Sequence, residues 1–190
     1  MTDPGGDPQN DAVERVICVD EADNPIGEAG KLDAHERGLL HRAFSVFLVD
    51  DQNRLLLQMR ALTKYHSGGL WANSCCGHPR PDEPIVEAAV RRTREELGLA
   101  ADLHEGFRFR YRANLENGLI ENELVHMMFG RLSGVPAPEP AEVADLRRMS
   151  LDALAEDVAR TPSIYAPWLR LYVGNGLEDL SSALAALEAT

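Results

Sequence analysis

The densest group of residues suited to metal chemistry runs from Gly77 to Leu99. Its carboxylates stand at the two ends of a predicted helix, with Glu83 before it and Glu95-Glu96 at its end. Clustered carboxylates bind hard divalent cations, and such cations commonly hold substrate phosphates as well. A solvated charged face is the alternative interpretation for a single helix of this composition. The fixed spacing of the charges favours a metal and phosphate site.

A thiol and an imidazole stand directly before this array, in the segment Trp71-Ala-Asn-Ser-Cys-Cys-Gly-His78. In an extended segment Cys76 and His78 fall on the same face, because successive side chains alternate. A thiol beside a metal-binding histidine at the mouth of a loop is placed for reactivity rather than packing. Cys75 points to the other face, and we expect it to be a small buried hydrophobic residue.

Two carboxylates and three histidines could form a metal centre. Glu121 and Glu123 share one face of a strand, and two adjacent carboxylates cost energy unless a cation lies between them. His35 and His41, taken one at a time, could be ordinary surface or hydrogen-bonded histidines. With His78 the five residues offer mixed nitrogen and oxygen ligands, which suit Mn²⁺, Mg²⁺, Zn²⁺ or Fe²⁺. The remaining histidines have no such company and are expected to have ordinary roles: His66, His104 and His126.

These segments together resemble the type I isopentenyl-diphosphate isomerases, a branch of the Nudix superfamily. The array from Gly77 resembles the Nudix box, a loop and helix that bind divalent metal and diphosphate. Arg92 stands where the box of the hydrolases has a glutamate, and Thr93 replaces a bulky apolar residue. The loss of that carboxylate argues against hydrolysis and agrees with the isomerase branch. The resemblance extends over about residues 13–173, on Lys31, His35, His41, Arg60-Ala-Leu-Thr-Lys64, Trp71 to Pro79, the box to Glu96, Tyr111-Arg112, Glu121-Asn-Glu123 and Ala166-Pro-Trp168.

The resemblance implies the reversible conversion of isopentenyl diphosphate to dimethylallyl diphosphate, by addition and removal of protons through a tertiary carbocation. It implies that Cys76 and Glu123 lie on opposite sides of the carbon skeleton and that Tyr111 helps to deliver or position a proton. Trp168 would stabilise the cation through its ring face. A role as an anchor in the core or at the rim is the alternative for Trp168.

The resemblance also implies two cations and a set of phosphate-binding side chains. The first cation, Mn²⁺ or another divalent metal such as Mg²⁺ or Zn²⁺, would be held by His35, His41, His78, Glu121 and Glu123. A Mg²⁺ that arrives with the diphosphate substrate would meet Glu96. The phosphate oxygens would be bound by Lys31, Arg60, Lys64 and Arg92. Two other functions stay open: a Nudix diphosphohydrolase, and a catalytically silent domain that binds metal or diphosphate.

Strands alternating with helices must position these residues. We expect strands over residues 13–19, 43–49, 55–59, 107–112 and 123–132, and helices over 84–97, 151–160, 165–173 and 177–188. Turns are predicted at 23–27 and 116–118, with a loop or short helix over 28–40. This order predicts an α/β (or α+β) fold in one compact domain over residues 13–190, after a disordered tail over 1–12. From the resemblance, we expect a Nudix-like mixed sheet sandwiched between helices.

The composition limits the choice of partners. The chain has 190 residues, 44% of them hydrophobic, and a net charge of −12, which is typical of a globular protein with a full core. This charge argues against binding of nucleic acid or of an anionic membrane surface. No apolar run approaches a membrane span, and no secretory signal is evident. The cysteines, Cys18, Cys75 and Cys76, form a poor disulfide framework, so we expect a cytoplasmic protein, a monomer or weak homo-oligomer.

Overall fold

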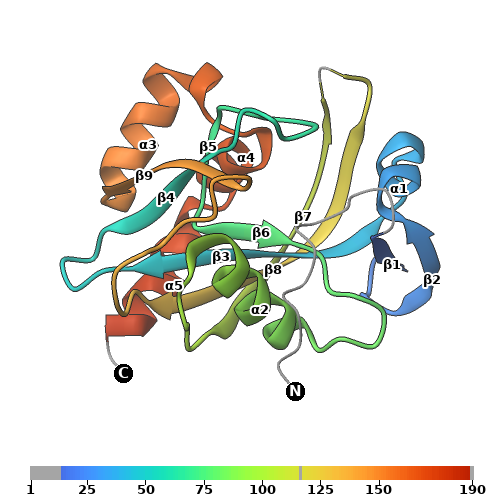
Figure 1. The fold of residues 1–190 in the computed structure, drawn as a ribbon, viewed down its shortest axis with the longest axis horizontal. Coiled ribbons are helices and arrows are strands. Elements are labelled where there is room, and N and C mark those ends of the chain that lie inside the picture. The colour runs from blue at the N-terminus through green and yellow to red at the C-terminus, as the bar shows by residue number, and fades with distance from the viewer. Residues whose placement is uncertain (1–13, 116, 189–190) are drawn as a thin grey trace.

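A nine-stranded mixed β-sheet forms the centre of the computed structural model, which describes residues 14–115 and 117–188 (Figure 1). Strands β3 and β8 run parallel, whereas β8 pairs with β7 antiparallel. The predicted tail over residues 1–12 lies outside the described residues, as does Glu116 of the predicted turn. The strands are β1 (Arg15–Val19), β2 (Pro25–Gly30), β3 (His41–Val49), β4 (Leu55–Arg60), β5 (Trp71–Ala72), β6 (Cys75–Gly77), β7 (His104–Asn114), β8 (Ile120–Arg131) and β9 (Val143–Met149).

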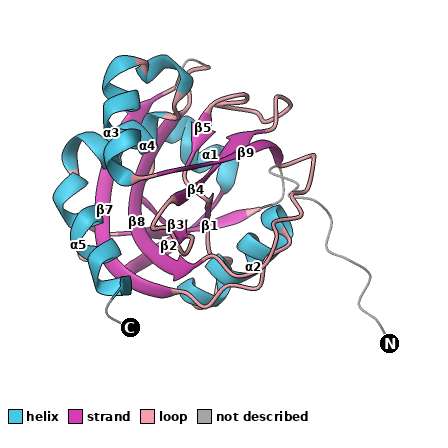
Figure 2. Ribbon diagram, turned by 90° about the vertical axis from the view of Figure 1, so that its left-hand side faces the viewer, coloured by secondary structure: helices cyan, strands magenta, loops and turns pink. Residues whose placement is uncertain are grey.

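Helices cover both faces of this sheet. Figure 2 shows α3, α4 and α5 together on one side of the strands and α2 on the other. The helices of the described chain are α1 (Lys31–Arg37), α2 (Ile85–Leu97), α3 (Leu151–Arg160), α4 (Pro167–Asn175) and α5 (Leu177–Glu188), with a 3₁₀ turn η1 (Pro162–Ile164). The predicted mixed sheet between helices is therefore confirmed. Among the described residues, none of these helices is long and apolar enough to cross a bilayer.

Strand β3 divides the core into two parts by its alternation. Phe44 and Val46 point to the α2 side, where they pack with Ala89 and Leu97. Phe47 points to the opposite side, into the cluster that α3, α4 and α5 cover. These side chains are fully buried, because the strand lies in the interior of the sheet with helices on both faces. The near-continuous apolar sequence of this strand follows from that position.

The register of the sheet brings together residues that are far apart in the sequence. His41 of β3 lies opposite Glu123 of β8, and Tyr111 of β7 lies opposite the same Glu123. Ser45 of β3 lies opposite Cys76 of β6. Partners in a ladder present their side chains to the same face of the sheet. These polar residues therefore lie on the same face of the sheet as Phe47, the face that α3, α4 and α5 cover.

Helix α2 buries part of its charged face. Arg92 and Glu96 are only 3% and 5% exposed, so the interpretation of a solvated face is wrong for these two residues. Pro84 is the N-cap and not the first helical residue, and no side chain caps the helix there. The Glu83 carboxylate instead pairs with Arg91 and accepts a hydrogen bond from the Arg80 backbone N–H.

Most other predicted elements are present, whereas the strands β2, β5, β6 and β9 are absent from the prediction. Helix α3 has the predicted bounds, and α4, α5, β3 and β4 lie within two residues of theirs. The segment 25–30 is strand β2 rather than the end of a turn; it is an edge strand, where a proline at the first position is tolerated. Strand β9 was not predicted, because Val143, Leu146 and Met149 have the spacing of a helix rather than of a strand.

Candidate active site

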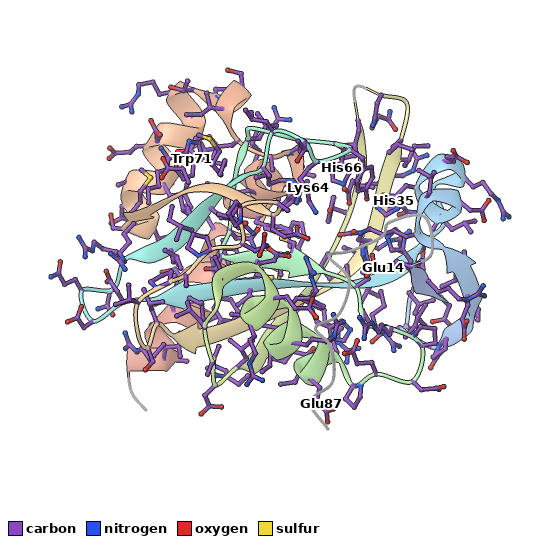
Figure 3. The ribbon with its side chains drawn as sticks, in the orientation of Figure 1. Glu14, His35, Lys64, His66, Trp71 and Glu87 are labelled. Carbon is purple, nitrogen blue, oxygen red and sulfur yellow. The ribbon has the colours of Figure 1, made fainter. Side chains whose placement is uncertain are left out.

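One pocket collects most of the predicted site residues. It spans about 510 Å³ of space free of protein atoms, including the solvent at its open mouth, at the polar end of the sheet face that also carries α4. Figure 3 labels His35 of α1 and His66 of the segment between β4 and β5, whose ring centroids lie 6.2 Å apart. The predicted residues that line the pocket are Lys31, His35, Arg60, Lys64, Cys76, His78, Glu96, Tyr111, Glu121, Glu123 and Trp168. Two predicted residues, His41 and Arg92, do not line it; each contacts residues that do.

Three histidines and one glutamate converge beside this pocket. One ligand atom each of His35, His41, His78 and Glu123 lies within 4.8 Å of the others, and all four residues are buried. His41 Nε2 is 3.2 Å from His78 Nε2, and His78 Nε2 is 3.0 Å from Glu123 Oε1. Helix α1 supplies His35 and ends directly before β3; its C-cap Gly38 has a φ of 62°, and a Cβ there would lie 3.1 Å from Ile120.

The hydrogen bonds of these histidines fit a divalent metal. The Nδ1 atoms of His35 and His41 donate to the backbone carbonyl oxygens of Lys31 and Leu39, at 2.7 and 2.8 Å. Such bonds leave the Nε2 atoms as free lone pairs, the arrangement found around metal-binding histidines. His35 Nε2 is buried and has no hydrogen-bond partner in the part of the chain that the structure describes. A buried unpaired acceptor is costly, and a bound cation would satisfy it.

Burial disfavours the protonated form of His35 and His78, and an imidazole must be unprotonated to bind a metal. Burial lowers the pKa of His35 to about 4, with smaller contributions from His78 and His41. Burial also lowers the pKa of His78. For Glu123 burial would raise the pKa, but the neighbouring imidazoles of His41 and His78 outweigh it and hold this pKa well below its ordinary value. The set thus combines imidazole nitrogens with one carboxylate, which suits a divalent cation.

Tyr111 links the two glutamates of β8. Its hydroxyl lies 2.8 Å from Glu123 Oε2 and 2.9 Å from Glu121 Oε2. Glu121 is not in the group of four ligand atoms; burial and the adjacent Glu123 raise its pKa well above the ordinary value. Burial also raises the pKa of Tyr111, so the phenol keeps its proton. Tyr111 is therefore able to hold a proton against the Glu123 carboxylate.

Cys76 lies at the pocket wall with its thiol held by polar neighbours. Its Sγ is 3.1 Å from Asn73 Oδ1 and 3.4 Å from Ser45 Oγ. Burial raises the pKa of this thiol to about 12, so it carries its proton at neutral pH. Cys75 is fully buried in the cluster under α2, which confirms that the two cysteines face opposite ways.

The basic residues of the site are held by buried carboxylates and aromatic rings. Lys64 Nζ lies 2.5 Å from Glu142 Oε2, and Arg92 pairs with both Glu96 and Glu142, at 2.5 and 3.3 Å. Burial lowers the pKa of Arg92, but the charge of Glu96 outweighs this and raises it. Glu96 also accepts a hydrogen bond from the Gln58 amide at 2.9 Å. The Lys64 and Arg92 side chains are thus held in place by the protein itself, without a bound ligand.

Two more basic residues lie against aromatic rings. The Arg60 guanidinium lies over the Trp168 ring, 5.2 Å from its centroid. The Lys31 ammonium lies 5.6 Å from the centroid of Tyr65 and 2.8 Å from Glu14 Oε2. One face of Trp168 therefore already contacts a cation, and the side chain is only 3% exposed. Both proposed roles of Trp168, anchor and cation-binding ring, agree with this position.

Sequence comparisons assign the chain to a family. A NUDIX domain model matches residues 39–172. An isopentenyl-diphosphate Delta-isomerase of Burkholderia multivorans is 51% identical over 160 residues, which are 84% of this chain and 91% of the relative. Isopentenyl-diphosphate Delta-isomerase 2 of Aromatoleum aromaticum is 50% identical over 156 residues, 82% of each chain. The chain belongs to the isopentenyl-diphosphate Delta-isomerase family.

The fold of this isomerase family member is also found in solved structures. A crystal structure of a Deinococcus radiodurans protein superimposes with a TM-score of 0.70 at 20% identity, over 84% of this chain and 97% of that one. At this identity the likeness concerns the fold alone. The expected Nudix-like fold is confirmed.

The isomerase pocket also contains residues that sequence reasoning missed. His66 lies 3.5 Å from Glu121 and 5.8 Å from the Trp168 ring centroid, and burial lowers its pKa to about 2. The residues next to His66 in the sequence do not indicate a site, because the residues that surround it in space come from α1, β8 and α4. Other missed lining residues are Ser45, Tyr65, Glu142 and Tyr172. His104 is exposed and His126 is bound between Asp23 and Glu105, so their ordinary roles are confirmed.

Proposed function

We propose that the protein catalyses the reversible isomerisation of isopentenyl diphosphate to dimethylallyl diphosphate. The observation that carries the proposal is that Cys76, Glu123 and Tyr111 line one pocket together with the basic residues Lys31, Arg60 and Lys64. A proton donor and a proton acceptor thus share a cavity with cations that suit a diphosphate. The membership of the isomerase family supports the same reaction.

The chemistry requires two proton transfers at carbon. A proton is added to the terminal carbon of the alkene, the positive charge develops at the tertiary carbon, and a proton leaves the carbon on the other side. In one direction one of Cys76 and Glu123 gives the proton and the other takes one; in the reverse direction they exchange roles. Tyr111, 2.8 Å from Glu123, holds a proton at that carboxylate. Buried surroundings exclude water, which would otherwise capture the carbocation.

The charged end of the pocket binds the diphosphate in this proposal. Lys31, Arg60 and Lys64 line the pocket and contact the phosphate oxygens, and Arg92 acts with them from behind Glu96. Trp168 presents its ring to the developing charge at the tertiary carbon, an effect worth about 2 kcal/mol when desolvated. The substrate is therefore oriented with its phosphates at the cations and its alkene between Cys76 and Glu123.

Divalent cations belong to the proposal as cofactors. His35, His41, His78 and Glu123, with Glu121 beside them, would hold Mn²⁺ or another divalent ion such as Mg²⁺ or Zn²⁺, which supplies positive charge next to the carboxylate. Glu96 would hold the Mg²⁺ that arrives with the diphosphate.

We further propose that the protein is a cytoplasmic monomer or weak homo-oligomer with one domain over residues 13–190. Its partner is the diphosphate substrate rather than nucleic acid or a membrane.

Hydrolysis of the diphosphate is the alternative reaction of this fold. Arg92 is a buried cation, paired with carboxylates, at the position where the hydrolase box has a metal-binding glutamate. The set of metal ligands expected for hydrolysis is therefore incomplete.

Incubation with isopentenyl diphosphate, Mg²⁺ and Mn²⁺, followed by ¹H and ³¹P NMR, separates the candidates. Dimethylallyl diphosphate without phosphate release supports isomerisation. Phosphate release without an allylic product would refute it in favour of hydrolysis. If the protein binds metal but converts no substrate, the catalytically silent domain is the candidate that fits.

A further inference from the structure

We propose that Asn73 is a positioning residue that fixes the Cys76 thiol and the Trp168 indole at one shared acceptor atom. Asn73 lies between β5 and β6 and is fully buried. It does not line the pocket, and it belongs to neither the set of metal ligands nor the basic residues. Its effect on the reaction would therefore pass through the two side chains that it holds.

All four hydrogen bonds of the Asn73 carboxamide are accounted for. Its Nδ2 donates to the backbone carbonyl oxygens of Val46 and Cys75, at 3.0 and 2.9 Å. Its Oδ1 accepts from Cys76 Sγ at 3.1 Å and from Trp168 Nε1 at 3.2 Å. An indole N–H is only a donor and a carbonyl is only an acceptor, so the amide has one possible orientation. The oxygen must face the site.

A carboxamide suits this position because it combines two donors with an acceptor on one rigid plane. The two carbonyl oxygens belong to the backbone of β3 and β6, so the sheet itself sets the direction of the Asn73 oxygen. That oxygen in turn joins β6, which carries the thiol, to α4, which carries the indole. The distance between the proton-transfer group and the aromatic ring is thereby fixed by the sheet rather than by the substrate.

This role rests on the proposed function, because it assumes that Cys76 transfers a proton and that Trp168 faces the carbocation. Pre-positioning of reacting groups contributes strongly to rate, and a misplacement of about 1 Å can cost about 10²-fold. Loss of Asn73 Oδ1 would free both side chains while the residues around the phosphates stay in place. We therefore expect kcat to fall and KM to change little.

The test compares Asn73→Ala with a matched control in the same turn. Ser74 is also fully buried; its Oγ donates to the Leu56 carbonyl at 2.7 Å and accepts from the Leu48 N–H at 2.8 Å. Ser74→Ala therefore removes structural hydrogen bonds of the same kind without touching the thiol or the indole. Asn73→Ser, which leaves a smaller cavity, replaces Asn73→Ala if the alanine variant does not fold.

Positioning predicts a kcat about 10²-fold below wild type for Asn73→Ala, with KM within about threefold and Ser74→Ala close to wild type. Equal values of kcat for the two variants would overturn the proposal. A wild-type protein that makes no dimethylallyl diphosphate would refute the proposed function instead, and the positioning would then be judged on the following signal alone.

The indole N–H resonance of Trp168 reports the contact without turnover. The chain has two tryptophans, so Trp71 serves as the internal reference in a ¹H–¹⁵N spectrum. In the wild type the Trp168 signal should exchange slowly with D₂O, and in Asn73→Ala it should shift upfield and exchange about tenfold faster or more. An unmoved Trp168 signal in the variant, or rapid exchange in the wild type, would overturn the proposal.

Discussion

The metal-ligand cluster predicts an unusual result for His35→Leu: the protein becomes more stable without metal and loses the stabilisation that metal gives. His35 is fully buried, and its Nε2 has no hydrogen-bond partner among the described residues. An unsatisfied buried polar atom costs about 1–3 kcal/mol, whereas the Nδ1 bond to the Lys31 carbonyl contributes about 0.5–1.5 kcal/mol. The net gain on substitution is about 1 kcal/mol, or about 2–4 °C in Tm for a chain of this size.

Bound metal should reverse the order of the melting temperatures, so that the wild type melts above His35→Leu. At about 1,000 times Kd a ligand that binds only the folded state contributes about 4 kcal/mol. For a chain of this size that is a rise of about 8–16 °C in the wild type. His35→Leu lacks one of three nitrogen ligands, so its rise should be less than half as large. Differential scanning calorimetry with EDTA, and then with increasing Mn²⁺, measures both effects.

His126→Leu is the matched control for this experiment. His126 is also buried, but both of its ring nitrogens are bonded to carboxylates, Glu105 at 2.9 Å and Asp23 at 3.0 Å. Its replacement removes both of these hydrogen bonds and should lower Tm in EDTA, while the rise with Mn²⁺ stays as in the wild type. The reasoning is refuted if metal-free His35→Leu melts below the wild type and still shows the full rise with Mn²⁺.

Three further predictions concern other parts of the molecule. Arg92→Met should lower the free energy of unfolding in urea by about 3 kcal/mol, because it leaves the buried Glu96 carboxylate without its charged partner. Arg91→Met, on the half-exposed face of the helix, should cost under about 1 kcal/mol, and equal costs for the two variants would contradict this reasoning. Tyr111→Phe should lower kcat about 10²-fold in the NMR assay, whereas Tyr165→Phe, a buried phenol bonded to a carboxylate elsewhere, should not; a loss under about threefold for Tyr111→Phe would exclude its role. The pKa of Glu83 lies below its ordinary value because hydrogen bonds from Arg91 outweigh the effect of burial, so its stabilisation is present above about pH 4.3 and is lost as the pH falls. Glu83→Gln should therefore lose less unfolding free energy than wild type between about pH 5 and pH 3, and parallel curves would contradict this.

Local sequence determined the elements whose signals are local. The predicted range of helix α3 agrees with its observed bounds, and the structure shows local reasons for this, because Ser150 caps the helix and the apolar residues that follow have helical spacing. Strand β3 could be predicted from a run of seven consecutive apolar or small residues, Ala43 to Val49. The run is apolar because the strand lies in the interior of the sheet. Strand β9 could not be predicted, because its side chains do not alternate and pairing with β4 holds it in place. Only the tertiary structure shows this pairing.

The site divides in the same way. Cys76, His78 and Glu123 could be predicted because their spacing matches a family pattern, and the register then places Glu123 opposite His41. His66 could not be predicted, because the residues that surround it come from three distant segments. Asn73 likewise has no local signature, since its function depends on the direction in which β3 and β6 turn its amide.

Turnover of isopentenyl diphosphate in D₂O tests the central claim, that Cys76 and Glu123 isomerise this substrate by exchange of protons. Mass spectrometry of the product should find solvent deuterium in dimethylallyl diphosphate made by the wild type. Cys76→Ala and Glu123→Gln should each reduce the rate by about 10²-fold or more. A product free of deuterium, or near-normal turnover by Cys76→Ala, would contradict the account.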